Sequence, residues 1–546
     1  MKRLFIYSIA SLLFCMQALA EEDLNSALKR AQYLLNGTIP GDDDFATSAV
    51  SKQAYDAAVR AMIEDQRFYD AALRYHEKVL GVGLPDEYIG ELIKEDIDGK
   101  QDKFASITCD RITGPSERFV CAWSKDYEKG RGTGCPVSSE IAASVFWYPG
   151  IAAWVCPSVI NNCGHDLSKC FIQFADENAA RNAELGATES FDSRFAVIKS
   201  LSRQAAGMAT AIAVENYPYT KILEPGLTAI DGAIAHFYQQ EHHFKISDLN
   251  IDPEVLNLIP SLSLTDTRFR LLKTSGNTTS HGGVISSFGW LRRYDKNRTR
   301  ANELYKRLLC REFTAELPAI FPQDPGNLRE APGCADCHSV LDPLADFFAA
   351  WGEGAGIYES NPEYISTSFA GCNGSTVAEL ASCVQQLPGF KTCTVQNVWH
   401  WLMGRGFYTD EEPLRDGLVS YFETTNFSFK ELVYAISTHP AFVDGQRTNA
   451  LVTDPLAAPP LGEIPTVEVS CEETIDYATD IAPLSANLCE QCHSDGSSRQ
   501  SLTTEAAWQS LGRAAVGMMF SGSMPPGGFN DDVQTLANNV QCWLEQ

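Results

Sequence analysis

The chain has 546 residues, a formal net charge of -27 and 44% hydrophobic residues. This length allows roughly two to four domains and a sizeable hydrophobic core. The strong negative charge argues against binding to nucleic acid or to anionic lipid head groups, because an acidic surface is repelled by both. A protein partner with a basic docking surface is favoured instead.

The first 20 residues have the pattern of a secretory signal peptide. Lys2 and Arg3 precede an apolar run over residues 4–14, and cleavage is expected near Ala20. The run is shorter than the roughly 20 apolar residues that a transmembrane helix needs. A lipid anchor at Cys15 is the alternative. We therefore expect a periplasmic or secreted protein without a membrane span.

Residues 21–245 are predicted to form a helical domain. One apolar stripe recurs at helical spacing and is made of Tyr55, Ala58, Val59, Met62 and Ile63. Helical patterning returns from Phe191 to Tyr238. Between them, residues from about 109 to 170 are rich in Cys, Gly, Pro and Asn with little periodicity, which predicts a disulfide-stapled insertion.

Residues 246–453 are predicted to form a second helical domain. A helix is expected from Arg300 to Phe313, followed by the sequence C-x-x-C-H at Cys334, Cys337 and His338. Later, Ser428 and Glu431 form an S-x-x-E pattern that predicts the start of a helix ending near His439. Strand signals are sparse, so the predicted fold class is mainly α.

A proline-rich linker at residues 454–465 separates a compact tail, residues 466–546. The tail contains a second C-x-x-C-H sequence, at Cys489, Cys492 and His493. Its last helix is expected to carry one apolar face, formed by Val533, Leu536, Ala537, Val540 and Leu544.

The two C-x-x-C-H sequences predict two covalently bound haem c groups. On a helix the two cysteines lie one turn apart, so each thiol can form a thioether to one porphyrin vinyl group. The histidine that follows is the proximal iron ligand. A zinc site would need two further ligands at short spacing. A redox-active disulfide would need a βαβ context that is not evident here.

Met524 is the expected distal ligand of the second haem. It precedes two prolines, which fix the backbone just after the sulfur, and a thioether ligand raises the potential of the iron. Met518 and Met519 are the competitors, but they end an apolar helix and suit a core position better.

The distal ligand of the first haem must come from elsewhere in the chain, because no methionine follows His338 closely. His281 is favoured, since the two glycines after it would allow the backbone to approach a flat macrocycle. His400 or Met403, His439 and an open position remain alternatives.

The remaining cysteines predict disulfides. Of 17 cysteines, Cys15 leaves with the signal peptide and four lie in the haem motifs, so twelve remain. This even number suits up to six disulfides in an oxidising compartment. Six of the twelve cluster in the insertion, and the sequence does not assign their pairing. Cys471 and Cys542 form a candidate pair across the tail.

The quoted motifs resemble two known families. The tail, with its C-x-x-C-H sequence, Met524 and a terminal helix, resembles a small class I cytochrome c domain. The larger part resembles exported cytochrome-associated proteins of unknown function that are abundant in planctomycetes and also occur in proteobacteria. The passages that carry this second resemblance are residues 58–69, 281–286 with 297–302, 332–343, and 402–405 with the later helix to 442. It implies haem binding and no particular reaction, and the cysteine-rich insertion departs from the pattern.

The expected protein is therefore an exported dihaem c-type cytochrome: helical and multi-domain, with a disulfide-rich insertion and a C-terminal cytochrome c-like domain. Electron transfer between periplasmic or extracellular redox partners is the favoured function. The alternatives are a peroxidase-like or oxygenase-like dihaem oxidoreductase with catalysis at the first haem, and a partner-binding or polymer-binding module with a cytochrome redox outlet.

Overall fold

The computed structural model describes about two thirds of the chain. The described ranges are 24–83, 106–112, 118–123, 135–145, 148–174, 193–239, 259, 262–273, 281–313, 328–331, 333–353, 364–446, 448–449, 475–489, 502–509, 535–536, 539–540 and 543. The predicted signal peptide, the proline-rich linker, Cys492, His493 and Met524 lie outside these ranges. In the described part, no helix is both long and apolar enough to cross a membrane.

The chain begins with a group of short helices. Residues 24–36 form the first, followed by α2 (Asp42–Ser48), α3 (Lys52–Glu64) and α4 (Phe68–Leu80). Ser51 caps α3 by accepting a hydrogen bond of 3.1 Å from the Ala54 backbone N–H. The predicted apolar stripe is confirmed, because Tyr55, Val59, Met62 and Ile63 are buried along α3.

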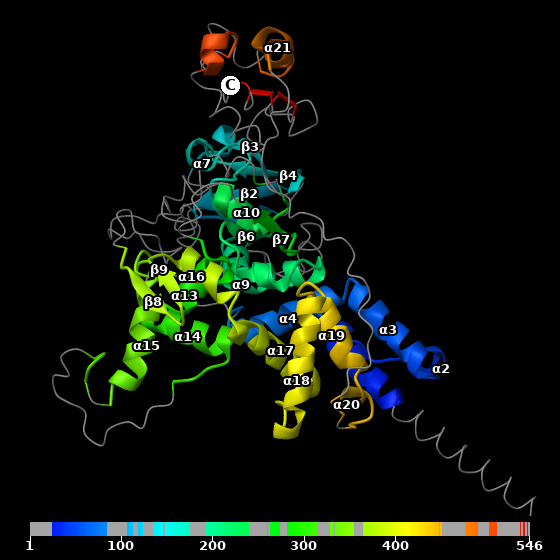
Figure 1. Ribbon diagram of the computed structural model, residues 1–546. Coiled ribbons are helices and arrows are strands. Elements are labelled where there is room, and N and C mark those ends of the chain that lie inside the picture. Colours follow the sequence, from blue (N-terminus) through cyan, green and yellow to red (C-terminus); the bar gives the residue numbers. More distant parts are fainter. Residues whose placement is uncertain are drawn as a thin grey trace, which may run out of the picture.

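The cysteine-rich insertion forms a β-sheet, although its sequence shows little periodicity and did not indicate strands. Its strands are β1 (Ser106–Ile112), β2 (Arg118–Trp123), β3 (Ile141–Val145), β4 (Tyr148–Val155) and β5 (Phe171–Phe174), in the order β3-β4-β2-β1-β5. The pairs β1–β2 and β3–β4 are antiparallel, whereas β2–β4 and β1–β5 are parallel. Figure 1 shows this sheet above the helical body, with α7 (Pro157–Cys163) beside it.

The predicted disulfides of the insertion are present. They join Cys109 to Cys121, Cys135 to Cys156, and Cys163 to Cys170. The first bridges β1 and β2 at directly opposed positions. Because paired cysteines occupy buried strand positions where Val or Ile would normally stand, the usual strand pattern was hidden.

A long helix, α9 (Ser193–Val214), runs through the middle of the helical body. It packs against α4, α10 (Gly232–Gln239) and α13 (Phe288–Arg293). Two short strands, β6 (Leu227–Ile230) and β7 (Arg270–Lys273), form an antiparallel pair beside it. The region from 191 to 238 is therefore mainly helical as predicted, but it is interrupted by η2 (Tyr219–Leu223) and β6.

The rest of the body is also mostly helical. It comprises η3 (Gly283–Ser286), α14 (Asn297–Leu309), α15 (Ala335–Asp346), the strand pair β8 (Thr367–Phe369) and β9 (Cys372–Gly374), α16 (Val377–Val384), α17 (Pro388–Met403), η4 (Thr409–Glu411), α18 (Glu412–Thr424), α19 (Phe429–Thr438) and α20 (Pro440–Val443). Ser428 caps α19 as predicted, accepting from the Glu431 N–H at 3.2 Å. One cluster of buried hydrophobic residues extends from Leu24 to Phe442.

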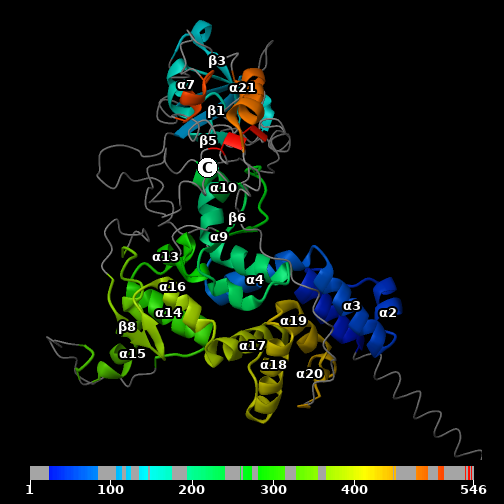
Figure 2. The ribbon, with the colours of Figure 1, turned by 45° about the horizontal axis from the view of Figure 1, so that its top comes forward.

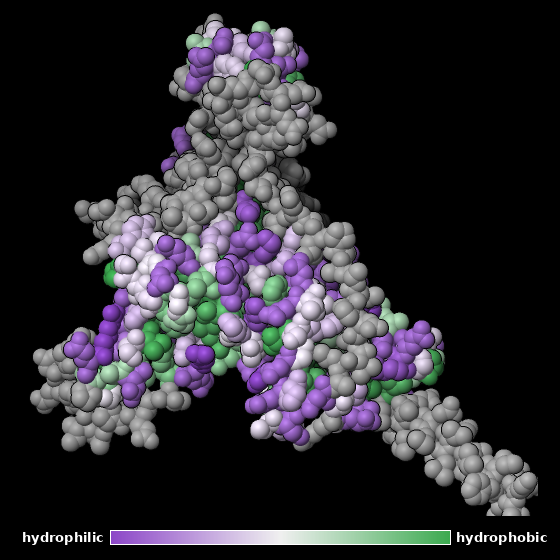
Figure 3. Space-filling view, viewed as in Figure 1, coloured by the Kyte–Doolittle hydropathy of each residue, from purple (hydrophilic) through white to green (hydrophobic). Residues whose placement is uncertain are grey.

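The C-terminal tail has a small core of its own. It includes η5 (Tyr477–Ile481) and α21 (Ala482–Leu488), and its buried residues are Ile481, Cys489, Leu502, Trp508, Leu536 and Val540. Leu536 and Val540 belong to the predicted apolar face of the last helix. Figures 1 and 2 both place α21 near the five-stranded sheet and α15 at the opposite end of the molecule. Figure 3 shows hydrophilic residues spread widely over the described surface in this view.

Candidate functional site

The first C-x-x-C-H sequence forms the start of α15. Cys334 is the N-cap residue, and its carbonyl accepts hydrogen bonds from the backbone N–H groups of Cys337 at 3.2 Å and His338 at 2.9 Å. This closes the first helical turn and brings both thiols to one side of the helix, as the spacing predicts. Both cysteines are half-buried and unpaired.

The pairing of the other cysteines sets these thiols apart. Five disulfides join ten of the described cysteines, including Cys310 with Cys393 and Cys372 with Cys383. Among the described residues, the thiols of Cys334 and Cys337 are free, and both belong to the first C-x-x-C-H sequence. The free thiols are thus those predicted to attach haem.

His338 is held by a carboxylate on the next turn of the same helix. Its Nδ1 lies 2.9 Å from Oδ1 of Asp342. Because an ionised carboxylate only accepts hydrogen bonds, Nδ1 is the donor in this contact, and in the neutral ring Nε2 carries the lone pair. Nε2 is then the nitrogen able to bind a metal. The donor set of two thiols and one imidazole therefore fits the protein side of a haem c site.

Two arginines also contact the carboxylate of Asp342. Arg298 donates from Nε to Oδ1 at 2.7 Å and from a terminal nitrogen to Oδ2 at 3.1 Å, and Nε of Arg329 lies 3.6 Å from Oδ2. Burial alone would raise the pKa of this carboxyl. Hydrogen bonds from Arg298 and His338 outweigh burial and hold the pKa below its ordinary value, so Asp342 is ionised at neutral pH.

A buried arginine fixes the segment that follows α15. The side chain of Arg300 is fully buried. It donates to the carbonyl oxygens of Trp351 at 3.0 Å and Gly352 at 3.1 Å, and also to those of Leu291 and Tyr294 in its own part of the chain. The chain after α15 is thereby tied to the start of α14, next to Arg298.

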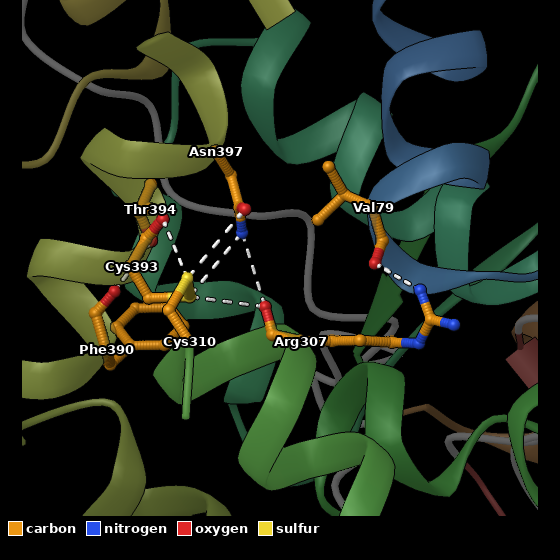
Figure 4. Close-up of a disulfide and its surroundings, with 7 residues drawn as sticks. All are labelled: Val79, Arg307, Cys310, Phe390, Cys393, Thr394 and Asn397. Carbon is orange, nitrogen blue, oxygen red and sulfur yellow. Dashed lines mark hydrogen bonds between the residues drawn. A yellow bond between two sulfur atoms is a disulfide. The ribbon is translucent and has the colours of Figure 1, made fainter. Parts of the chain in front are cut away.

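A disulfide joins the two helices beneath this region. Cys310 follows α14 and is bonded to Cys393 in α17 (Figure 4). Beside it, the Asn397 side chain donates to the carbonyl of Arg307 at 3.3 Å, and the Arg307 guanidinium reaches the carbonyl of Val79 in α4 at 2.9 Å. The loop closed by this disulfide contains α15.

His281 lies beside Trp351, with a centroid separation of 6.3 Å. The cavity next to His281 has a volume of about 30 Å³, which suits a water molecule and is too small for a porphyrin. The neighbouring glycines approach protein rather than a macrocycle: a Cβ at Gly283 would lie 2.2 Å from the carbonyl oxygen of Ile222. His281 as the distal ligand of the first haem stays a prediction.

The other candidates differ in exposure. His439 is buried, and its Nδ1 accepts from the Ala441 N–H at 3.1 Å, which makes it the cap of α20. His400 is exposed on α17 and borders a cavity of about 820 Å³ together with Arg74 and Trp401. Met403, half-buried, ends the same helix. The sixth ligand of the first haem thus stays a prediction.

The second motif is described only at its first residue. Cys489 is buried in the tail core, and its backbone N–H donates to the carbonyl of Ser485 at 2.8 Å. Cys492, His493 and Met524 lie outside the described residues, so the second haem site rests on the sequence.

The supporting residues of the first site were not predicted as such. Arg298 and Asp342 both stand in the passages that carry the family resemblance, but no role was assigned to either. The available signal was the spacing of His338 and Asp342, because side chains at i and i+4 of a helix face one another.

Within the described residues, no group of three or more His, Cys, Asp or Glu side chains could hold a metal ion. A scan against models of protein families, a search of curated proteins and a search of solved structures found no match to this chain.

Proposed function

We propose that the chain is an exported c-type cytochrome that carries two covalently bound haems and transfers electrons between redox partners outside the cytoplasm. The observation that carries the proposal is the selective pairing of cysteines. Ten described cysteines are joined in disulfides, whereas the thiols at Cys334 and Cys337 are free. Disulfides form and persist in oxidising compartments, and thioether bonds to a haem account for two thiols that stay out of disulfides in the C-x-x-C-H sequence.

The first haem would be held by thioethers from Cys334 and Cys337 and by Nε2 of His338. The thiols lie one turn apart on one helix, and Asp342 orients the imidazole. A bound haem supplies an iron that accepts and releases one electron. The second haem would be held in the same manner at Cys489, Cys492 and His493, with Met524 as its distal ligand.

Electron transfer to separate partners is supported by charge and by arrangement. The net charge of -27 favours docking of a basic partner, with association rates that fall as the ionic strength rises. α15 carries the first C-x-x-C-H sequence, and α21 directly precedes the second. These two helices lie at opposite ends of the molecule (Figures 1 and 2). Each haem would then meet its own partner.

A dihaem oxidoreductase with catalysis at the first haem is the second candidate. An open sixth position is one of the alternatives that the sequence leaves for the first haem, and one candidate ligand, His439, already uses its Nδ1 to cap α20. A first haem without a strong sixth ligand could bind a small substrate.

Optical and EPR spectra of the mature protein, in both redox states and with added cyanide or carbon monoxide, test these functions. Two low-spin haems that ignore both ligands are the result expected of an electron carrier. A high-spin signal that responds to cyanide or carbon monoxide, and disappears in His338→Ala, would assign catalysis to the first haem instead.

A further inference from the structure

The hydrogen bond between His338 and Asp342 has a chemical consequence beyond holding the ring. The acceptor is a carboxylate, its side chain is 9% exposed, and it lies 2.9 Å from Nδ1. A histidine that ligates a metal through one nitrogen commonly donates its other N–H to a neighbour, and a carboxylate acceptor raises the basicity of the ligating nitrogen. A neutral carbonyl oxygen in the same place would raise the basicity of the ligating nitrogen less.

We propose that Asp342 is the positioning residue of the first haem site: it leaves Nε2 of His338 as the ligating nitrogen and lowers the reduction potential of that haem. The inference rests on the proposed haem attachment at Cys334, Cys337 and His338. A more basic ligand stabilises the ferric iron more than the ferrous iron, and the potential falls accordingly. The first haem would therefore have the lower potential of the two, because a thioether ligand such as Met524 raises the potential of the second.

Arg298 opposes this effect and limits it. Its two donated hydrogen bonds, at 2.7 and 3.1 Å, draw negative charge of the carboxylate away from His338. The side chain of Arg298 is 54% exposed, so solvent screens much of its charge, whereas the carboxylate of Asp342 is 9% exposed. The carboxylate is thus held in place and remains the stronger influence on the imidazole.

The simpler interpretation is that Asp342 only forms an ordinary ion pair on the helix surface. Asp346, one turn further along α15, provides the comparison. It pairs with Arg329 at 2.8 Å, and it carries the same charge on the same helix. If only charge mattered, neutralising either aspartate would shift the potential in a similar way.

The test uses the full-length protein with both haems attached and measures the two midpoint potentials by optical redox titration. Asp342→Asn should raise the lower potential by about 59 mV, which corresponds to a tenfold change in a one-electron equilibrium constant. Asp346→Asn should raise it by less than a third of that amount. Arg298→Gln should lower it, because the carboxylate then loses the two hydrogen bonds from Arg298 and keeps only Arg329, at 3.6 Å, as an arginine neighbour. The EPR g-values of the same haem should change in Asp342→Asn and stay unchanged in Asp346→Asn.

Equal shifts in Asp342→Asn and Asp346→Asn would overturn the inference, since charge alone would then explain both. If Asp342→Asn does not mature, Arg298→Gln decides: a lower potential supports the inference, and an unchanged or higher one overturns it. A mass showing no haem on the peptide that contains Cys334 and Cys337 would instead defeat the proposed function itself.

Discussion

Removing the disulfide between Cys310 and Cys393 should destabilise the helical body more than removing any shorter one in the same region. The bond closes a loop of 83 residues that contains α15, whereas the bond between Cys372 and Cys383 closes one of 11 residues. The loss of loop-closure entropy in the unfolded chain gives about 4.6 kcal/mol for 83 residues and about 2.8 kcal/mol for 11 residues at 25 °C. The expected difference is therefore about 2 kcal/mol.

The two bonds can be compared with matched double variants. In each, the buried cysteine becomes alanine and the more exposed one serine: Cys393→Ala with Cys310→Ser, and Cys372→Ala with Cys383→Ser. Hydrogen exchange of peptides from α9, which lies in the shared core, reports the opening free energy of the body without requiring the whole chain to unfold in one step. Equal losses in the two variants, or a larger loss without the short-loop bond, would refute the entropic reasoning.

Three further predictions concern the same body. Replacing Arg300 by methionine should lower the free energy of unfolding by about 3 to 5 kcal/mol, because buried carbonyl groups lose their hydrogen-bond donor. A decrease in melting temperature no larger than that of a surface variant would count against this prediction. Burial lowers the pKa of His76 from 6.5 to about 3, so the unfolded chain binds a proton at a higher pH than the folded chain does. The free energy of unfolding should therefore fall by up to about 1.4 kcal/mol per pH unit as the pH drops from 6.5 toward 3. His76→Leu should flatten this part of the stability–pH curve, and parallel curves for the two proteins would disprove the prediction. Gly283→Ala should destabilise the protein by about 1 to 3 kcal/mol more than Gly371→Ala does. Both glycines have positive φ, but a Cβ at Gly283 would lie 2.2 Å from a carbonyl oxygen, whereas a Cβ at Gly371 would have no atom within 4 Å. Equal melting temperatures of the two variants would show that the close contact is unimportant.

Helices with strong apolar periodicity were predictable from the sequence, and the β-sheet was not. The stripe from Tyr55 to Ile63 and the cap at Ser428 both appear where the pattern places them. The sheet escaped prediction because its strands pair partly in parallel, so that the partners of β1 and β2 include strands distant in sequence. Such pairing depends on contacts that no local pattern records.

The candidate site, like the fold, was predictable where local sequence determines it and not where distant segments meet. The haem motif specifies Cys334, Cys337 and His338 by local spacing alone. The arginine that holds Asp342 lies 44 residues earlier in the chain, and it reaches the site only because α14 packs against α15. Two glycines after His281 were interpreted as room for a macrocycle, but they allow close contact between segments of the protein, which glycine permits equally well.

The most direct test of the central claim is the haem content of the mature protein, exported from a host that has the cytochrome c maturation machinery. Intact mass under denaturing conditions, together with a pyridine haemochrome spectrum, should show two covalently attached haems per chain. The double variant Cys334→Ala with Cys337→Ala should retain one haem, with all five described disulfides still formed. A wild-type mass equal to that of the processed chain without haem would contradict the account.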